Sequence, residues 1–176
     1  MGIGWLKRLQ NVAMEGFGDL MVMRPDIAYI PTPLDAIEAM LDLAAVSQAD
    51  VVYDLGCGDG RLLIQAAHRC GARGVGIDID PDRVAEAQRN AQTAGVSDRL
   101  SFRQCNLYDS DFSDATVIML YLMPHLNLRL RPRLQAQLQP GSRIVSHQFD
   151  MGDWLPQKVI RLMPSEEDST LYLWRI

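Results

Sequence analysis

An α/β fold is predicted by this sequence of 176 residues: a seven-stranded, mostly parallel sheet with helices on both faces. Three observations support this prediction. Short apolar runs typical of buried strands alternate with helical segments between residues 34 and 149. Short loops with glycine or proline join them. Two final runs, residues 158–162 and 170–174, are joined by a polar turn and indicate a closing antiparallel hairpin.

Residues 1–24 form a separate segment in this interpretation, an amphipathic helical extension ahead of a domain that spans residues 25–176. Its apolar residues recur at helical spacing, interrupted by two glycines, and are Trp5, Leu6, Leu9, Val12, Ala13, Phe17, Leu20 and Met21. Trp5 beside two basic residues favours peripheral contact with a membrane or a partner protein. The alternative is a helix folded back over the domain, or a partly disordered segment.

The chain approaches its first domain helix through residues 25–33. Prolines in this stretch favour an extended backbone, and Thr32 can cap the helix that follows, with Pro33 at its first position. We expect this helix over residues 35–45, where apolar residues recur at helical spacing. It would lie beside the ligand site and place Tyr29 at its edge.

The central unit of the chain is a strand, a glycine loop and a helix, predicted over residues 51–53, 54–60 and 61–69. Three glycines at alternate positions remove the Cβ atoms from one side of the loop, so a ligand can lie against the backbone amides. The next strand, residues 74–77, ends at Asp78. A carboxylate at this position can accept hydrogen bonds from both hydroxyls of a ribose.

The remaining elements continue the alternation. In order, they are a helix over residues 82–94, a strand over 99–104, a strand over 115–121, a helix to about residue 138 and a strand over 142–149. The run at 115–121 is almost wholly apolar, as expected of a central parallel strand, and it places Tyr121 at the rim of the site. Asn106 follows the third strand, where its amide could meet an adenine edge. A plain turn residue is the alternative.

Composition restricts the function classes. A net charge of −5 and a pI near 5.1 provide no overall basic field for nucleic acid, whereas an acidic surface suits a lysine-rich partner or simply keeps the protein soluble. Cys57, Cys70 and Cys105 lack C-x-x-C spacing, so we expect no disulfide framework and no metal site, and a cytoplasmic location fits. No apolar run approaches the roughly 20 residues that span a bilayer.

The loop reads Asp54-Leu-Gly-Cys-Gly-Asp-Gly60, which resembles the signature of class I S-adenosylmethionine-dependent methyltransferases. It departs from the G-x-G-x-x-G pattern that presents amides and a helix dipole to the pyrophosphate of nicotinamide and flavin dinucleotides. Asp54 could instead take the ammonium of a methionine moiety, directly or through water, near its positive sulfur. The resemblance implies a Rossmann-like class I methyltransferase fold, S-adenosyl-L-methionine as cofactor and S-adenosyl-L-homocysteine as product.

From about residue 27 onward, the chain is similar to small archaeal protein-lysine methyltransferases, relatives of the ATP synthase c-subunit lysine methyltransferase. Residues 29–33, 52–61, 127–132 and 140–147 carry this narrower resemblance. It implies a transferase that acts on a protein with an accessible lysine. By this resemblance and the glycine loop, the cofactor-binding residues are Tyr29, Thr32, Asp54, Gly56, Gly58, Gly60, Asp78, Ile79, Asn106, Leu107 and Tyr121.

The reaction that the resemblance implies is direct displacement, in which a neutral lysine amine attacks the methyl group in line. Free lysine titrates at about 10.4, so a desolvated channel edged by the predicted catalytic residues Tyr29 and Tyr121 would favour the neutral amine. A dedicated base is not required. His125 or His147 could assist, but the strand pattern around His147 is typical of a hydrogen-bonded structural histidine.

Other acceptors stay open at this point. The segment from Tyr121 to His125 differs from the Asp/Asn-Pro-Pro-aromatic segment of enzymes that methylate adenine or glutamine, which favours an aliphatic amine. A methyltransferase acting on a small molecule or RNA is the main alternative, and a non-catalytic S-adenosylmethionine-binding domain is another. Arg129, Arg131 and Arg133 form a basic run, either a solvated face or a contact for RNA or anionic lipid. The oligomeric state is not predicted.

Overall fold

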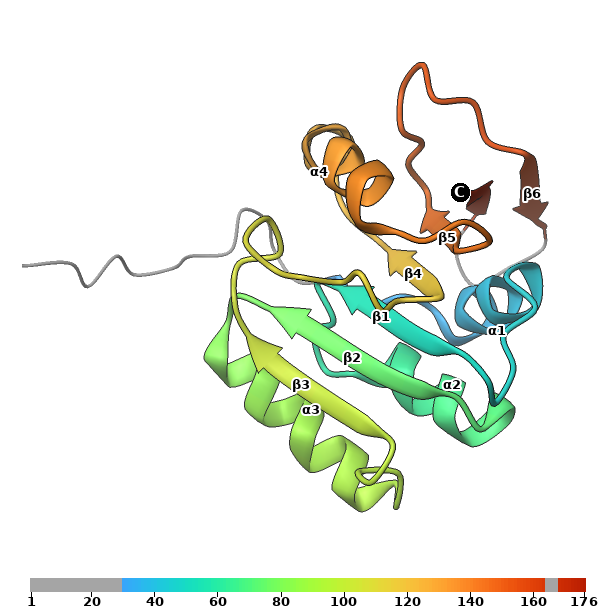
Figure 1. Ribbon diagram of the computed structural model, residues 1–176. Coiled ribbons are helices and arrows are strands. Elements are labelled where there is room, and N and C mark those ends of the chain that lie inside the picture. The colour runs from blue at the N-terminus through green and yellow to red at the C-terminus, as the bar shows by residue number, and fades with distance from the viewer. Residues whose placement is uncertain (1–29, 164–167) are drawn as a thin grey trace, which may run out of the picture.

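The computed structural model describes residues 30–163 and 168–176, which form a single sheet with flanking helices (Figure 1). The helices are α1 (Leu34–Leu43), α2 (Arg61–Cys70), α3 (Pro81–Thr93) and α4 (Pro124–Gln137). The strands are β1 (Val51–Leu55), β2 (Arg73–Asp78), β3 (Leu100–Gln104), β4 (Val117–Leu120), β5 (Arg143–His147), β6 (Lys158–Leu162) and β7 (Ser169–Arg175).

The sheet has seven strands in the order β3-β2-β1-β4-β5-β7-β6. The first five of these are parallel to one another, and β7 pairs antiparallel with both β5 and β6. The predicted α/β fold, with its mostly parallel sheet and closing antiparallel hairpin, is therefore confirmed. The strand order reverses direction between β1 and β4, which is the point where open α/β sheets bind ligands at the carboxyl ends of their strands.

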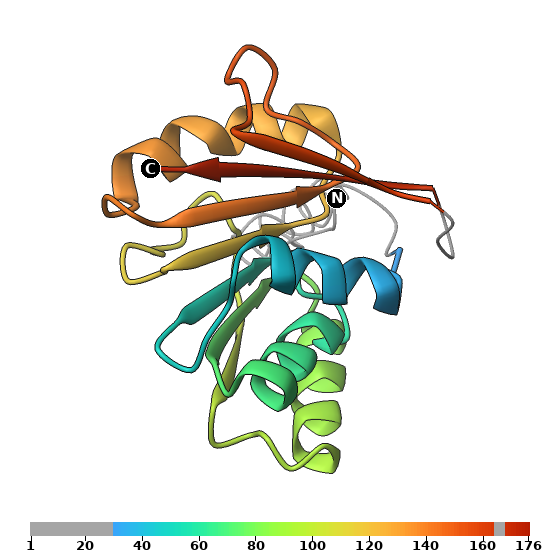
Figure 2. The ribbon, with the colours of Figure 1, turned by 90° about the vertical axis from the view of Figure 1, so that its right-hand side faces the viewer.

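Two apolar cores cover the two faces of the sheet because successive strand residues point to opposite sides. Figure 2 shows α1, α2 and α3 on one face and α4 on the other. Val52, Val117 and Val145 pack against α1 and α2 in one core. Tyr53 and Ile118 belong to the other core, which contains the apolar face of α4. Both faces of β1, β4 and β5 are covered, so these strands read as nearly continuous apolar runs.

Several predicted boundaries need correction: the strand expected over residues 115–121 is Val117–Leu120, and the helix expected to reach residue 45 ends at Leu43. Two further differences have a local reason. Thr32 does not cap α1: the N-cap residue is Pro33, with ψ of 150°, and no side chain accepts a hydrogen bond there. The Asp35 carboxylate, one residue into the helix, accepts the N–H of Ala36 instead. The strand predicted to reach residue 149 ends at His147, because Gln148 takes a left-handed φ of 68° that breaks the extended backbone.

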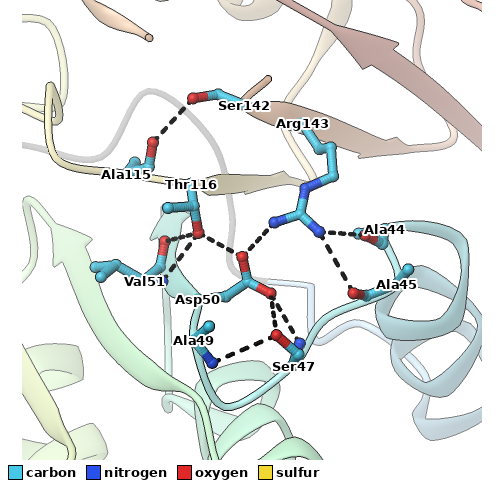
Figure 3. A network of polar contacts seen from close by, with 10 residues as sticks. All are labelled: Ala44, Ala45, Ser47, Ala49, Asp50, Val51, Ala115, Thr116, Ser142 and Arg143. Carbon is cyan, nitrogen blue, oxygen red and sulfur yellow. Dashed lines mark hydrogen bonds and ion pairs between the residues drawn. The ribbon is translucent and has the colours of Figure 1, made fainter. Parts of the chain in front are cut away.

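A polar network closes the sheet at the edge opposite the glycine loop, where β1, β4 and β5 begin (Figure 3). Asp50 and Arg143 form a buried ion pair, and Asp50 also accepts a hydrogen bond from the Thr116 hydroxyl at 2.7 Å. Arg143 in turn donates to the carbonyl of Ala44 at 2.8 Å, just after α1. The network ties α1 to the first residues of three strands, so it stabilises the scaffold at a distance from the site.

The predicted helical extension, residues 1–24, and the domain boundary after it lie outside the described residues, and both stay predictions. Across residues 30–163 and 168–176, no helix combines the length and the apolar character needed to cross a membrane.

Candidate active site

The glycine loop connects β1 to α2 at the carboxyl edge of the sheet. Gly56, Gly58 and Gly60 all have positive φ, at 91°, 51° and 79°. The backbone N–H groups of Gly56 and Cys57 donate to the carbonyl of Ile77, at 2.8 Å and 3.0 Å, which anchors the loop to the end of β2. A Cβ atom on Gly60 would lie 2.9 Å from Ala87 Cβ, so the turn requires glycine there.

Asp78 ends β2 and holds the glycine loop from the other side. Its Oδ2 accepts the N–H of Gly58 at 2.9 Å, and its Oδ1 accepts the N–H of Asp80 at 3.0 Å. An ionised carboxylate has about four acceptor positions, so two remain for a ligand. The geometry is compatible with the predicted contact to ribose hydroxyls, but part of the acceptor capacity of Asp78 is used to shape the loop.

Asp54 is the most unusual charged group of the site. It lies near the end of β1, is 7% exposed, and receives no hydrogen bond from any residue in the described part of the chain. Burial, followed by the negative charges of Asp78 and Asp59, raises the pKa of its carboxyl group to about 7. A buried carboxylate is stabilised by a proton or by a cation beside it, so this environment is compatible with the predicted contact to the ammonium group of an amino acid.

A small hollow opens beside Asp54 and collects residues from four parts of the chain. Four predicted site residues line it together: Thr32, Asp54, Gly56 and Tyr121. Thr32 precedes α1, whereas Tyr121 directly follows β4. The structure therefore brings the predicted cation-binding acid, the loop and the predicted methyl-transfer end to one place. Tyr29, the other predicted catalytic residue, lies outside the described residues, although Ile30 lines the hollow.

The tyrosine at the rim rests on a buried histidine. The rings of Tyr121 and His147 have their centroids 4.2 Å apart at an interplanar angle of 50°. The Nε2 atom of His147 shares a hydrogen bond of 2.8 Å with the hydroxyl of Ser169. Burial lowers the pKa of His147 to about 4, so the ring is neutral at pH 7. The predicted hydrogen bond of His147 is therefore present.

The remaining predicted residues lie along the same edge but do not line the hollow. Gly58 and Gly60 belong to the loop, and Ile79 follows β2. Asn106 and Leu107 follow β3, at the far side of β2. The Oδ1 atom of Asn106 accepts the N–H of Tyr108 at 2.9 Å, so the turn interpretation of this residue is confirmed for its oxygen. Its amide N–H groups are the part that could still meet a base.

Two charged residues of the hollow were not predicted as site residues from the sequence. Asp59 and Arg61 both line it and form an ion pair at 2.8 Å, with two further hydrogen bonds from the Arg61 Nε. These two residues flank Gly60 at i, i+2 spacing, a pattern from which the ion pair could be predicted. The pair places a second acid close to Asp54, and this charge contributes to the raised pKa of Asp54.

Comparison with known proteins agrees with this geometry. The profile of the ANTKMT methyltransferase domain matches residues 54–158. A protein-lysine N-methyltransferase of Saccharolobus islandicus (strain REY15A) is 41% identical over 153 residues, which are 86% of this chain and 95% of that protein. The adenine nucleotide translocase lysine N-methyltransferase of Mus musculus is 32% identical over 78% of this chain. The match spans 60% of that longer relative, less than two thirds of its length.

A solved structure with the same fold is described as an RNA methyltransferase, whereas the two relatives above are lysine N-methyltransferases. The crystal structure of an RNA methyltransferase from Salinibacter ruber, in complex with S-adenosyl-L-homocysteine, is 52% identical, with a TM-score of 0.80. The match covers 84% of this chain and 94% of that chain. The resemblance predicted from the glycine loop and its flanking segments is thus confirmed. The chain belongs to the ANTKMT methyltransferase domain family and is an S-adenosylmethionine-dependent methyltransferase.

Proposed function

We propose that this chain transfers a methyl group from S-adenosylmethionine to the side-chain amine of a lysine in a protein. The observation that carries the proposal is the buried carboxylate of Asp54, which opens on the same hollow as Thr32 and Tyr121. This arrangement offers negative charge at one end and an aromatic wall at the other. A positively charged cofactor and a neutral amine are the two reactants that suit these ends.

The cofactor end is built from acids and backbone amides. In this proposal Asp54 binds the ammonium of the methionine moiety, and Asp78 binds the ribose through its two remaining acceptor positions. Ile79, Asn106 and Leu107 flank the base. The loop glycines let the backbone approach the ligand closely. When bound, S-adenosylmethionine supplies a sulfonium methyl group that a neutral amine attacks directly, with the amine proton passing to water.

The acceptor end needs no residue of unusual chemistry, because the methyl group arrives activated. Tyr121 and Thr32 form a wall of the hollow that excludes water from the amine and orients it by contact and hydrogen bonding. Tyr29, which precedes the described residues, is proposed to complete this wall. Desolvation favours the neutral lysine over the ammonium, which is the form that can react.

An RNA acceptor is the second candidate, because the Salinibacter ruber structure is described as an RNA methyltransferase. The basic run on α4 argues against it. Arg131 pairs with Asp153, Arg133 donates to the carbonyl of Ser110 at 3.0 Å, and Arg129 lies 3.9 Å above the Tyr108 ring. Each of these guanidinium groups has a partner within the chain, so the run forms no stripe reserved for phosphates.

Two further features complete the proposed setting. A protein with an exposed lysine is the partner, in a reducing cytoplasm that keeps the three cysteines as thiols. Residues 1–24 are proposed to contact a membrane surface through their apolar residues. Comparing the full chain with a variant that lacks residues 1–24 in sedimentation with anionic vesicles tests this contact. Equal sedimentation of the two proteins would show that residues 1–24 do not provide it.

The acceptor can be identified by transferring a labelled methyl group. The purified protein is incubated with labelled S-adenosylmethionine and a cell lysate, and parallel samples are digested with protease or with ribonuclease. Label that protease releases, and that mass spectrometry locates on lysine, supports the proposal. Label that ribonuclease alone releases would assign RNA, and label confined to small molecules would assign a metabolite. Asp54→Asn serves as the binding-deficient control, and Asp98→Ala, an exposed acid far from the loop, as the matched active control.

A further inference from the structure

We infer that His147 and Ser169 are positioning residues for methyl transfer, which together hold the ring of Tyr121 against the hollow. The inference rests on the proposed function, because it gives Tyr121 a place beside the acceptor amine. It adds two residues that do not touch the hollow themselves. His147 was considered above only as a base or a structural residue, and Ser169 belongs to no sequence motif of the site.

Strand register brings the three residues together from distant parts of the chain. Leu120 of β4 is paired with Ser146 of β5, so Tyr121 and His147 are the next residues on neighbouring strands. The antiparallel β7 lies on the other side of β5, where Leu171 is the register partner of His147. Ser169, the first residue of β7, lies two residues before Leu171 and reaches His147 diagonally through its hydroxyl. Tyr121, His147 and Ser169 thus form a row across three strands, and the row ends at the hollow.

The contacts along this row join the Tyr121 ring to two buried residues. His147 is fully buried and Ser169 is 1% exposed. The hydrogen bond between Nε2 and the Ser169 hydroxyl, at 2.8 Å, fixes the orientation of the imidazole. That imidazole then lies against the Tyr121 ring, at 4.2 Å between centroids. Tyr121, a partly buried residue just after β4, therefore has one side of its ring in contact with a buried imidazole.

The energetics indicate that this row is not explained by core packing. The Nδ1 atom of His147 is buried and has no hydrogen-bond partner among the described residues. An unpaired buried nitrogen destabilises the folded state, and an aliphatic side chain would avoid this cost. A histidine in this position fits a need for a flat, rigid surface behind Tyr121 better than a need for stability.

A direct role as a base does not fit the geometry. His147 does not line the hollow, whereas Tyr121 does. Its Nε2 is already engaged by Ser169, and burial opposes protonation of the ring. The negative charge of Asp35, at the start of α1, raises the pKa of His147, but by less than burial lowers it. Its effect on the reaction must therefore pass through the tyrosine ring.

Three variants separate the ring surface from the hydrogen bond. His147→Ala removes both, and His147→Gln keeps an amide that can reach Ser169 but removes the ring. The double variant His147→Phe with Ser169→Ala keeps a flat ring and leaves no unpaired hydroxyl. We expect His147→Ala and His147→Gln to lower kcat for lysine methylation by about 10- to 100-fold through misplacement of Tyr121. The double variant should restore kcat most of the way. The Kd for S-adenosylhomocysteine, measured by calorimetry, should change by a smaller factor than kcat in all three.

Other results would overturn the inference. Loss of activity in the double variant equal to that of His147→Ala, with a changed pH profile, would make His147 a base. A Kd that rises in step with a falling Tm would make the row merely structural. Ser169→Ala alone is the milder variant if His147→Ala does not fold, and a kcat equal to that of the unmodified protein would contradict the inference.

A second measurement does not depend on the acceptor. In protein with isotope-labelled tyrosine, assigned with Tyr121→Phe, the Tyr121 ring should be held in one orientation by NMR. It should gain mobility in His147→Ala and regain order in the double variant. An unchanged ring in His147→Ala would refute the inference. If the lysate experiment shows no methylated lysine, the proposed function fails, whereas this readout still decides whether His147 and Ser169 hold Tyr121.

Discussion

The carboxylate of Asp78 accepts a hydrogen bond from the backbone N–H of Gly58 at 2.9 Å, so the acid at the end of β2 holds the middle of the glycine loop. This residue therefore has two tasks. It shapes the loop before a ligand arrives, and it keeps two acceptor positions that these two hydrogen bonds do not use.

Substitution of Asp78 is expected to affect both tasks. Asp78→Ala should weaken binding of S-adenosylhomocysteine by about 1–3 kcal/mol, because the ribose loses its acceptors. The Tm should also fall, since the N–H of Gly58 loses its partner. Isothermal titration calorimetry and thermal melting measure the two effects. Asp98→Ala, at an exposed acid on a loop, is the control that should change neither. Unaltered affinity in Asp78→Ala would contradict the ribose assignment.

Asp54→Asn is expected to weaken cofactor binding while it stabilises the protein without cofactor. The pKa of Asp54 is raised from 3.8 to about 7, so the folded protein keeps this proton to a higher pH than the unfolded chain. The favourable contribution of the protonated group is therefore lost as pH rises through that window. Above about pH 7, the buried charge of Asp54 lowers the free energy of unfolding by on the order of 4 kcal/mol, at about 1.4 kcal/mol for each pKa unit.

Melting curves at several pH values test whether the stability contributed by protonated Asp54 is lost as pH rises. Asp54→Asn should have a higher Tm than the unmodified protein at about pH 8, and the gap should narrow as pH falls below about 7. The unmodified protein should also bind S-adenosylhomocysteine more tightly as pH rises through 7, since the ammonium ligand favours the ionised acid. A variant with unchanged affinity, or a gap that is independent of pH, would show that Asp54 does not hold the ammonium.

Alanine at two glycines of similar φ separates backbone strain from steric overlap. Gly60 has φ of 79° and a new Cβ would lie 2.9 Å from the ring of Phe102, whereas Gly95 has φ of 71° with open space around it. Gly95→Ala should cost about 1–2 kcal/mol, the conformational cost alone. Gly60→Ala should cost about 1–3 kcal/mol more, through overpacking. Urea denaturation measures the free energy of unfolding of both variants. Equal decreases would mean that the glycine loop shifts enough to remove the overlap with Phe102.

The network at the opposite edge should matter for stability and not for chemistry. Burial pushes the pKa of Asp50 up, but hydrogen bonds from Thr116 and Ser47 and the charge of Arg143 outweigh it and hold the pKa below its usual value. The stability that Asp50 contributes is thus present above pH 3.8 and lost as pH falls below it. Arg143→Ala should cost about 3–5 kcal/mol, because it leaves a buried charge unpaired.

Chemical denaturation at neutral pH measures the loss of stability in Arg143→Ala. The Kd for S-adenosylhomocysteine is measured beside it and should equal that of the unmodified protein. The double variant Asp50→Asn with Arg143→Met removes both charges and should recover much of the lost stability. A changed Kd in Arg143→Ala, with the protein still folded, would show coupling between the two edges of the sheet.

Much of the fold could be predicted because its signals are local. The apolar runs of β1, β4 and β5 are long enough to identify as buried strands, and proline or glycine marks the ends of α3. Boundaries that depend on tertiary contacts were harder. The end of β5 at His147 comes from the left-handed φ of 68° at Gln148, a residue type with no strong local preference for that conformation. Gln148 is held there by a hydrogen bond from its N–H to the carbonyl of Thr170 on β7, a partner more than twenty residues away.

The glycine loop, the two acids at the ends of β1 and β2, and the family they indicate could all be predicted from the order of residues alone. A missing Cβ, or a carboxylate after a strand, has the same meaning in any fold. The burial of Asp54 without a donor, and the contacts of His147 with Tyr121 and Ser169, became known from the folded chain. Burial and contact across strands depend on which strands become neighbours, and the order β4-β5-β7 cannot be read from residue spacing.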